Sequence, residues 1–166
     1  FRSWLWRQSN RLVGGDKLWD AARRAHGADV TCANLCWWYA MGASTDVCVT
    51  PRPVYYVDGK KGPGVYTYPA DVGAELVHQL GEFPLFDFWG PRAGIASSRW
   101  IADAARRVFD QRRPTLTMVY LPHLDYDLQR FGSRGPEARA AAAAIDEVAG
   151  GLADHVRAAS ATVVVL

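Results

Sequence analysis

The residues that could carry chemistry are concentrated in one segment, residues 120–132, which reads Tyr-Leu-Pro-His-Leu-Asp-Tyr-Asp-Leu-Gln-Arg-Phe-Gly. Asp125 and Gln129 lie four residues apart in it, so in a helical turn both side chains project to the same side. Two side-chain oxygens that converge in this way could bind a single metal ion. We therefore interpret Asp125 and Gln129 as candidate metal ligands.

Other roles remain open for the residues of this segment. Asp125 could instead cap the segment that follows it, and Gln129 could be an ordinary exposed polar residue. His123 could contact a substrate or orient a metal ligand from behind, or it could be a loop histidine that is only hydrogen-bonded. Asp127 alternates with Asp125 in sequence and is expected to face away from it.

Strong secondary-structure patterns flank the segment and would position it. The clearest strand pattern in the chain, residues 115–121, precedes it, and the longest amphipathic helix begins after it at Pro136. In open α/β sheets, ligands bind beyond the carboxyl ends of the strands. Residues 120–132 thus lie where an active-site loop is expected.

The rest of the chain alternates between helical and extended patterns. Apolar residues at three- and four-residue spacing indicate helices, and short β-branched apolar runs indicate strands. Helices are predicted at 18–26, 69–80, 98–109 and 136–156, and strands at 29–35, 84–88, 115–121 and 162–166. This alternation predicts an α/β fold in which a mostly parallel sheet is sandwiched between helices.

Residues 37–68 depart from this alternation because they are rich in aromatic residues, glycine and proline. Such a composition predicts turns that join short extended pieces. We interpret residues 37–68 as an irregular or hairpin insertion near a ligand opening; alternatively, they form a lid whose aromatic side chains only cover the core. The whole chain, residues 1–166, is expected to be a single α/β domain.

Composition narrows the classes of function. A chain of 166 residues with 49% hydrophobic residues can form a globular core, which argues against disorder. The net charge is only +2 and the basic residues are scattered, so no nucleic-acid-binding surface is expected. No apolar run reaches the length of about 18 residues typical of a membrane span. These features favour a soluble protein, and the cytoplasm over export.

The cysteines and the remaining histidines give no further site. Three cysteines, at positions 32, 36 and 48, are an odd number, and the spacing of the first two is not that of a zinc knuckle. We expect reduced, buried thiols. The histidines at positions 26, 78 and 155 fall on predicted helices or at their ends, at no ligand spacing, and are expected to be structural or solvated.

The segment around Asp125 resembles the metal-site segment of type I phosphodiesterases and nucleotide pyrophosphatases in the alkaline phosphatase superfamily. That family usually has Asp, three residues, His, two residues and Gly-Pro, where this chain has Asp125, Gln129, Gly132 and Ser133. The motifs at residues 6–10, 50–53, 88–91 and 120–125 are similar to those of a bacterial branch of the family.

The resemblance implies an alkaline-phosphatase-like core, present here in part, and divalent metal ions, with zinc expected first. Gln129 stands where the family has histidine. An amide oxygen suits zinc less well than an imidazole nitrogen does, and it suits manganese or magnesium better. The implied substrate is a small molecule that contains a phosphoryl group.

The family also implies a Thr or Ser nucleophile that two metal ions activate. Thr31 lies in a segment that is superficially similar, but the downstream Gly and His-Gly signature is missing, so we expect Thr31 to be structural. A further Asp-His ligand pair would follow the strand predicted at residues 162–166, where the chain ends. We therefore expect an internal fragment of a larger catalytic domain, without its nucleophile and its second metal-site segment.

The expected function is that of the central portion of a metal-dependent hydrolase of phosphodiester or nucleotide pyrophosphate bonds, inactive when isolated. One alternative is a noncatalytic α/β binding or interaction module. Another keeps the superfamily but changes the reaction to that of a sulfatase, a phosphomutase or a phosphonate hydrolase, because fold alone does not decide the chemistry. Nothing in the sequence predicts the oligomeric state.

Overall fold

The computed structural model describes residues 8–166, so Trp6 and Arg7, at the start of the motif at residues 6–10, lie outside the described residues. In chain order the elements are η1 (Asn10–Leu12), α1 (Leu18–His26), β1 (Cys32–Leu35), β2 (Val47–Pro51), β3 (Val54–Tyr55), β4 (Lys61–Gly62), β5 (Val65–Tyr68), α2 (Ala70–Leu80), α3 (Leu85–Phe88), α4 (Ile95–Arg112), β6 (Leu116–Val119), α5 (Leu124–Phe131) and α6 (Pro136–Ala158).

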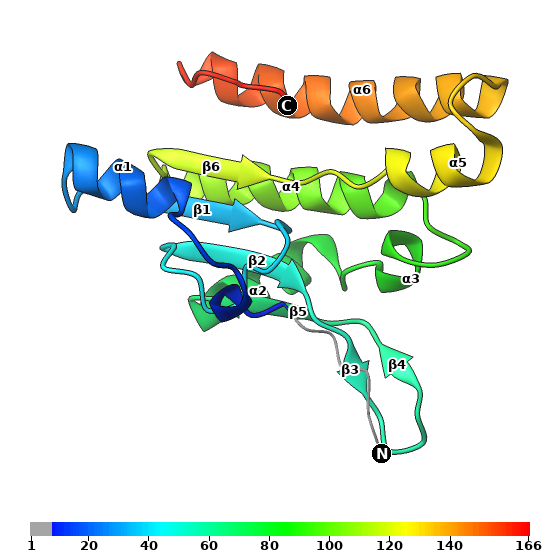
Figure 1. The fold of residues 1–166 in the computed structure, drawn as a ribbon, viewed down its shortest axis with the longest axis horizontal. Coiled ribbons are helices and arrows are strands. Elements are labelled where there is room, and N and C mark those ends of the chain that lie inside the picture. Colours follow the sequence, from blue (N-terminus) through cyan, green and yellow to red (C-terminus); the bar gives the residue numbers. More distant parts are fainter. Residues whose placement is uncertain (1–7) are drawn as a thin grey trace.

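A four-stranded sheet with the order β5-β2-β1-β6 forms the centre of the molecule. Strand β1 is parallel to both of its neighbours, β2 and β6, whereas β5 is antiparallel to β2. In Figure 1, α2 and α4 lie behind the sheet and α1 lies in front of it. The predicted α/β fold, a mostly parallel sheet between helices, is therefore confirmed. The carboxyl ends of β1, β2 and β6 share one edge of the sheet, hereafter the carboxyl edge.

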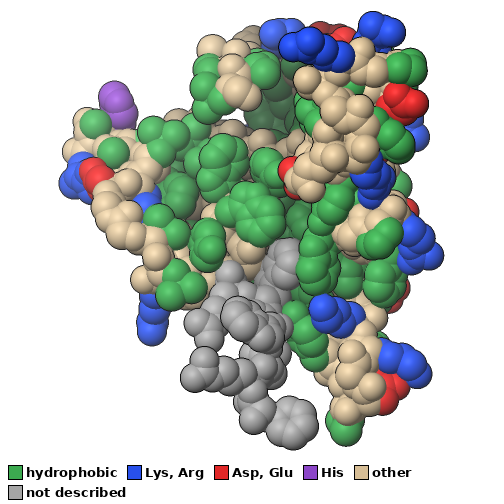
Figure 2. Space-filling view, turned by 45° about the vertical axis from the view of Figure 1, so that its right-hand side comes forward, with side chains coloured by type: hydrophobic (Ala, Val, Ile, Leu, Met, Phe, Trp, Pro, Cys, Tyr) green, Lys and Arg blue, Asp and Glu red, His purple; other side chains and the backbone are tan. Residues whose placement is uncertain are grey.

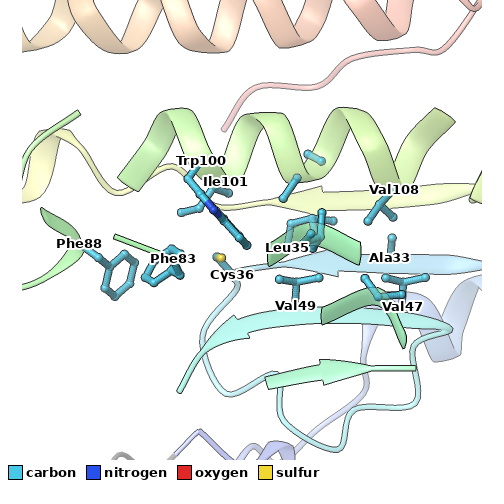
Figure 3. Packing of buried hydrophobic residues seen from close by; sticks show 14 of the residues in the cluster. Ala33, Leu35, Cys36, Val47, Val49, Phe83, Phe88, Trp100, Ile101 and Val108 are labelled. Carbon is cyan, nitrogen blue, oxygen red and sulfur yellow. The ribbon is translucent and has the colours of Figure 1, made fainter. Parts of the chain in front are cut away.

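The main core lies between the sheet and α4. Alternate residues of a strand point to the same face, and those of β1 and β2 that face α4 are fully or almost fully buried. They pack against apolar residues of α4 that recur at helical spacing. Near α3 the core ends in a group of aromatic side chains, in which the ring centroids of Phe83 and Trp100 are 5.2 Å apart. Figure 3 labels the principal members: Ala33, Leu35, Cys36, Val47, Val49, Phe83, Phe88, Trp100, Ile101 and Val108.

A smaller cluster covers the other face. Trp19 of α1 packs with Val30 and Cys32, and Leu116 and Met118 of β6 lie against them. Helix α6 packs along α4 and α5 (Figure 1). The sheet therefore has helices on both sides, and α6 forms an outer layer over α4.

The strand predicted at residues 84–88 is wrong, because Leu85–Phe88 form the short helix α3. Leu85 and Phe88 are buried while Phe86, between them, is 45% exposed. Positions three residues apart share a side of a helix, whereas a strand would have placed residues 86 and 88 on one face. Packing of Leu85 and Phe88 into the aromatic end of the core selects the helix.

The strand predicted at residues 162–166 is also wrong, because this run has no regular secondary structure and pairs with no described strand. Val164 and Val165 are 75% and 84% exposed. A β-branched run becomes a strand only where a partner strand satisfies its backbone groups. Here the run follows α6, which packs on α4, and no ladder forms beside β6.

Residues 37–68 contain elements of two kinds. Strands β2 and β5 belong to the main sheet, and the sequence patterns did not indicate β2 as a strand. Strands β3 and β4 pair with each other as a separate antiparallel hairpin that points away from the body of the molecule (Figure 1). The glycine- and proline-rich stretch predicted to form turns forms this hairpin and its connection to β5.

Candidate functional site

The segment at residues 120–132 leaves the carboxyl edge after β6 and forms helix α5. Pro122 precedes the helix, and its carbonyl accepts a hydrogen bond from the N–H of Asp125 at 3.1 Å. Gly132 ends it with a φ of 75°, a positive value that glycine adopts without strain. The helical turn that the spacing of Asp125 and Gln129 requires is therefore present.

Asp125 and Gln129 are exposed and lie side by side on α5. The Nε2 atom of Gln129 donates a hydrogen bond to Oδ1 of Asp125 at 2.7 Å. The amide oxygen is thus turned away from the carboxylate. Rotation of the amide about its last bond would bring Oε1 next to the carboxylate and make two oxygen donors available to one cation.

Two donors fall short of a full catalytic site, since zinc sites in enzymes normally have three protein ligands. No group of three or more His, Cys, Asp or Glu side chains that could hold a metal ion occurs among residues 8–166. The described residues therefore fit a divalent cation in part: they supply a carboxylate and an amide oxygen, and a complete site needs at least one more ligand.

His123 occupies the position just before α5, in helical conformation. Its Nδ1 atom is buried and has no hydrogen-bond partner among the described residues. Most buried ring nitrogens in proteins are paired, and an unpaired one costs free energy. No contact among the described residues therefore compensates for the burial of the His123 ring nitrogen.

Arg130, which the sequence analysis did not single out, makes the most polar contacts in α5. It forms an ion pair with Asp127 at 3.1 Å and donates to the main-chain carbonyls of Gly90 and Pro91 at 3.1 and 2.9 Å. Asp127 is therefore paired with Arg130 and does not belong to the Asp125–Gln129 pair. The two carbonyl groups lie about forty positions away in the chain, and no local sequence signal indicates them.

Aromatic residues flank α5 at the carboxyl edge. Trp37 and Trp38 follow β1, and their rings lie 6.4 and 6.1 Å from that of Tyr120, which follows β6. Figure 2, turned toward this end of the strands, shows hydrophobic side chains gathered over the middle of the face. The two residues that bracket the tryptophans, Cys36 and Tyr39, have positive φ angles of 61° and 53°. The backbone is therefore held in an unfavourable conformation where it presents Trp37 and Trp38.

Asn34 is a second residue that the sequence analysis missed. It is wholly buried near the end of β1, and its Oδ1 atom accepts a hydrogen bond from the N–H of Trp37 at 3.2 Å. Its Nδ2 atom has no partner among the described residues. The side chain thus braces the turn that carries the tryptophans.

Thr31 lies at the opposite edge of the sheet, just before β1. Its N–H donates to Oγ1 of Thr115 at 3.3 Å, and its own Oγ1 accepts from the N–H of Thr115 at 3.2 Å. This reciprocal pair joins the start of β1 to the start of β6. The position supports a structural role, since α5 and its carboxylates lie beyond the other end of these strands.

The three cysteines are buried and form no disulfide bond, as expected. Burial raises the pKa of the Cys48 thiol to about 12, and burial also raises the pKa values of Cys36 and Cys32. All three are therefore protonated thiols at neutral pH and poor nucleophiles.

His155 has a structural contact, with its Nε2 atom 2.9 Å from Oδ1 of Asp110, which links α6 to α4.

Comparison with known proteins identifies a family for the chain. The family model of the type I phosphodiesterases and nucleotide pyrophosphatases matches residues 2–166. Neither a curated protein nor a solved structure matches the chain. Among the described residues, no helix is both long and apolar enough to cross a membrane.

Proposed function

Because the chain belongs to the type I phosphodiesterase and nucleotide pyrophosphatase family, we propose that it supplies the central α/β part of a metal-dependent hydrolase of phosphodiester or nucleotide pyrophosphate bonds. The substrate is then a small molecule that contains a phosphoryl group. The fold agrees with this, since the α/β core with a mostly parallel sheet is the one expected of an alkaline-phosphatase-like protein.

One observation carries the proposal: Asp125 and Gln129 lie in contact on a helix at the carboxyl edge of the parallel strands. This edge is where α/β proteins bind ligands. Asp125 contributes an anionic oxygen and Gln129 a neutral one. His123, just before the helix, acts as a positioning residue or contacts the substrate, a role that its unpaired, buried Nδ1 atom supports.

A divalent cation bound there would stabilise the negative charge that develops on the phosphoryl oxygens during hydrolysis. Zinc is the ion that the family resemblance favours. Two oxygen donors without an imidazole suit manganese or magnesium better. We therefore expect the α5 donors to bind manganese at least as tightly as zinc.

The same geometry limits what this chain does alone. The proposed site has only two donors among the described residues, fewer than the three protein ligands usual in catalytic zinc sites, and Thr31 lies at the far edge of the sheet. The isolated chain is thus expected to bind a cation weakly and to turn over no phosphodiester.

The test is calorimetric titration of the purified chain with zinc and with manganese, beside the variants Asp125→Ala and Asp146→Ala. Asp146 is an exposed carboxylate on α6 and controls for the loss of one negative charge. Each protein is also assayed for release of nitrophenol from bis(4-nitrophenyl) phosphate.

Binding that is lost in Asp125→Ala, kept in Asp146→Ala and accompanied by no turnover supports the proposal. Turnover by the wild-type chain would contradict the expected inactivity and would require a nucleophile within it. Absence of binding in the wild type would overturn the metal site and favour the noncatalytic module.

A further inference from the structure

The side chain of Arg130 connects α5 to the turn between α3 and α4. The guanidinium donates from Nη2 to the carbonyl oxygens of Gly90 and Pro91 at 3.1 and 2.9 Å, and from Nη1 to that of Ala93 at 3.4 Å. This turn, residues 89–94, is itself closed by a hydrogen bond from the N–H of Gly94 to the carbonyl of Asp87 at 2.8 Å. Three carbonyls of one turn thus converge on a single side chain.

Two neighbours on α5 hold the guanidinium in place. Asp127 accepts from Nη1 at 3.1 Å, and the guanidinium carbon lies 5.5 Å from the centre of the Tyr126 ring. A guanidinium has five N–H donors in a rigid plane, so it can bind several carbonyls and a carboxylate together. A lysine ammonium at this position carries the same charge but cannot span the same set of acceptors.

The hydrogen bonds of Arg130 matter for the position of helix α5 because apolar packing holds this helix only in part. None of its residues is buried, whereas eight residues of α4 are. Apart from Arg130, its principal support is α6, which packs along it. The direction of α5, and with it the placement of the Asp125 and Gln129 side chains, therefore depends on the contacts that Arg130 makes.

We propose that Arg130 is a positioning residue, which fixes α5 against the turn at residues 89–94 and thereby sets the affinity of Asp125 and Gln129 for a divalent cation. The inference rests on the proposed function for the cation itself. Charge alone predicts the opposite effect, because a positive side chain next to a cation site repels the cation.

The experiment compares Arg130→Lys and Arg130→Gln with the wild-type chain by calorimetric titration with manganese. Arg112→Gln is the matched control, since Arg112 also forms an ion pair with an aspartate, Asp71, at 3.0 Å, far from α5. We expect about tenfold weaker binding in both Arg130 variants and unchanged binding in Arg112→Gln. Urea denaturation measures the free energy of unfolding of each protein. If Arg130→Gln and Arg112→Gln lose similar stability but only Arg130→Gln loses affinity, the effect on binding comes from positioning and not from a general loss of stability.

Unchanged affinity in Arg130→Lys, or tighter binding in Arg130→Gln, would overturn the inference and leave Arg130 as a simple charge. If the wild-type chain binds no cation, the proposed function fails and the effect of Arg130 on affinity fails with it. Amide hydrogen exchange then tests separately whether Arg130 fixes α5 against the turn at residues 89–94. Faster exchange along α5 in both Arg130 variants, but not in Arg112→Gln, supports this role, and unchanged exchange refutes it.

Discussion

The amide nitrogen of Gln129 lies 2.7 Å from a carboxylate oxygen of Asp125, so the two candidate ligands are hydrogen-bonded to each other. A cation that used both residues would have to replace this bond with two metal–oxygen contacts and turn the amide over. The bond keeps the two side chains together, and it also competes with the cation.

Replacement of Gln129 by histidine should provide an imidazole nitrogen, which zinc prefers to an amide oxygen. We expect Gln129→His to bind zinc several-fold more tightly, with a smaller gain for manganese, as measured by calorimetry. Gln129→Ala is the control, and it should bind both ions more weakly than the wild type. Equal zinc affinity in Gln129→His and Gln129→Ala would show that position 129 does not contact the ion.

Thr31→Val should lower the free energy of unfolding by about 1 kcal/mol, since the N–H of Thr115 loses its hydroxyl acceptor. Urea denaturation measures this loss. Titration of the same variant with manganese should give the wild-type isotherm, because Thr31 lies at the edge of the sheet remote from α5. A fall in cation affinity without a fall in stability would show that Thr31 contributes to the cation site and is not only structural.

Two substitutions in α3 distinguish a helix from the strand that the sequence suggested. Leu85→Ala should lower the free energy of unfolding by about 2–5 kcal/mol, since it leaves a cavity in the core. Phe86→Ala should cost less than about 1 kcal/mol, because this ring is 45% exposed and its centre lies 5.4 Å from the guanidinium carbon of Arg92, a surface contact. Chemical denaturation that gave the reverse order would show that residue 86, not 85, faces the core, as in a strand.

The three thiols should resist a thiol reagent at pH 8 until the protein unfolds. With a pKa of about 12, only about one Cys48 side chain in 10⁴ is a thiolate at that pH, and burial blocks access as well. Ellman's reagent measures the reaction, with the exposed position in Ser44→Cys as the reactive control. Fast labelling of the native wild-type chain would contradict the burial of the cysteines.

The parts of the fold that the sequence predicted are those in which local pattern and tertiary packing agree. The apolar positions of α4 face the main core with helical spacing, and Val119 of the predicted strand β6 packs against the same core. Helix α3 and the run at residues 162–166 show the opposite case, since their local pattern favours a strand but the surrounding structure provides no partner strand.

For the candidate site, too, the sequence indicated some contacts and not others. The spacing of Asp125 and Gln129 indicated their contact, because it depends on a single helical turn. The contacts of Arg130 with the turn at residues 89–94 were not indicated, since they are made to main-chain carbonyls, which carry no signature in the sequence. The buried amide of Asn34 was hidden for a related reason: only the folded backbone shows that it braces the turn at Trp37.

The pairing of β1 with β6 has a consequence for synthesis of the chain. The reciprocal bonds between Thr31 and Thr115 join positions 84 residues apart, and β1 pairs with β6 along its whole length. At ribosomal rates, an interval of that length takes about 4–17 s to translate. During that time the nascent β1 lacks its neighbour on one side, so β1, an inner strand of the finished sheet, is an edge strand while the chain is being made.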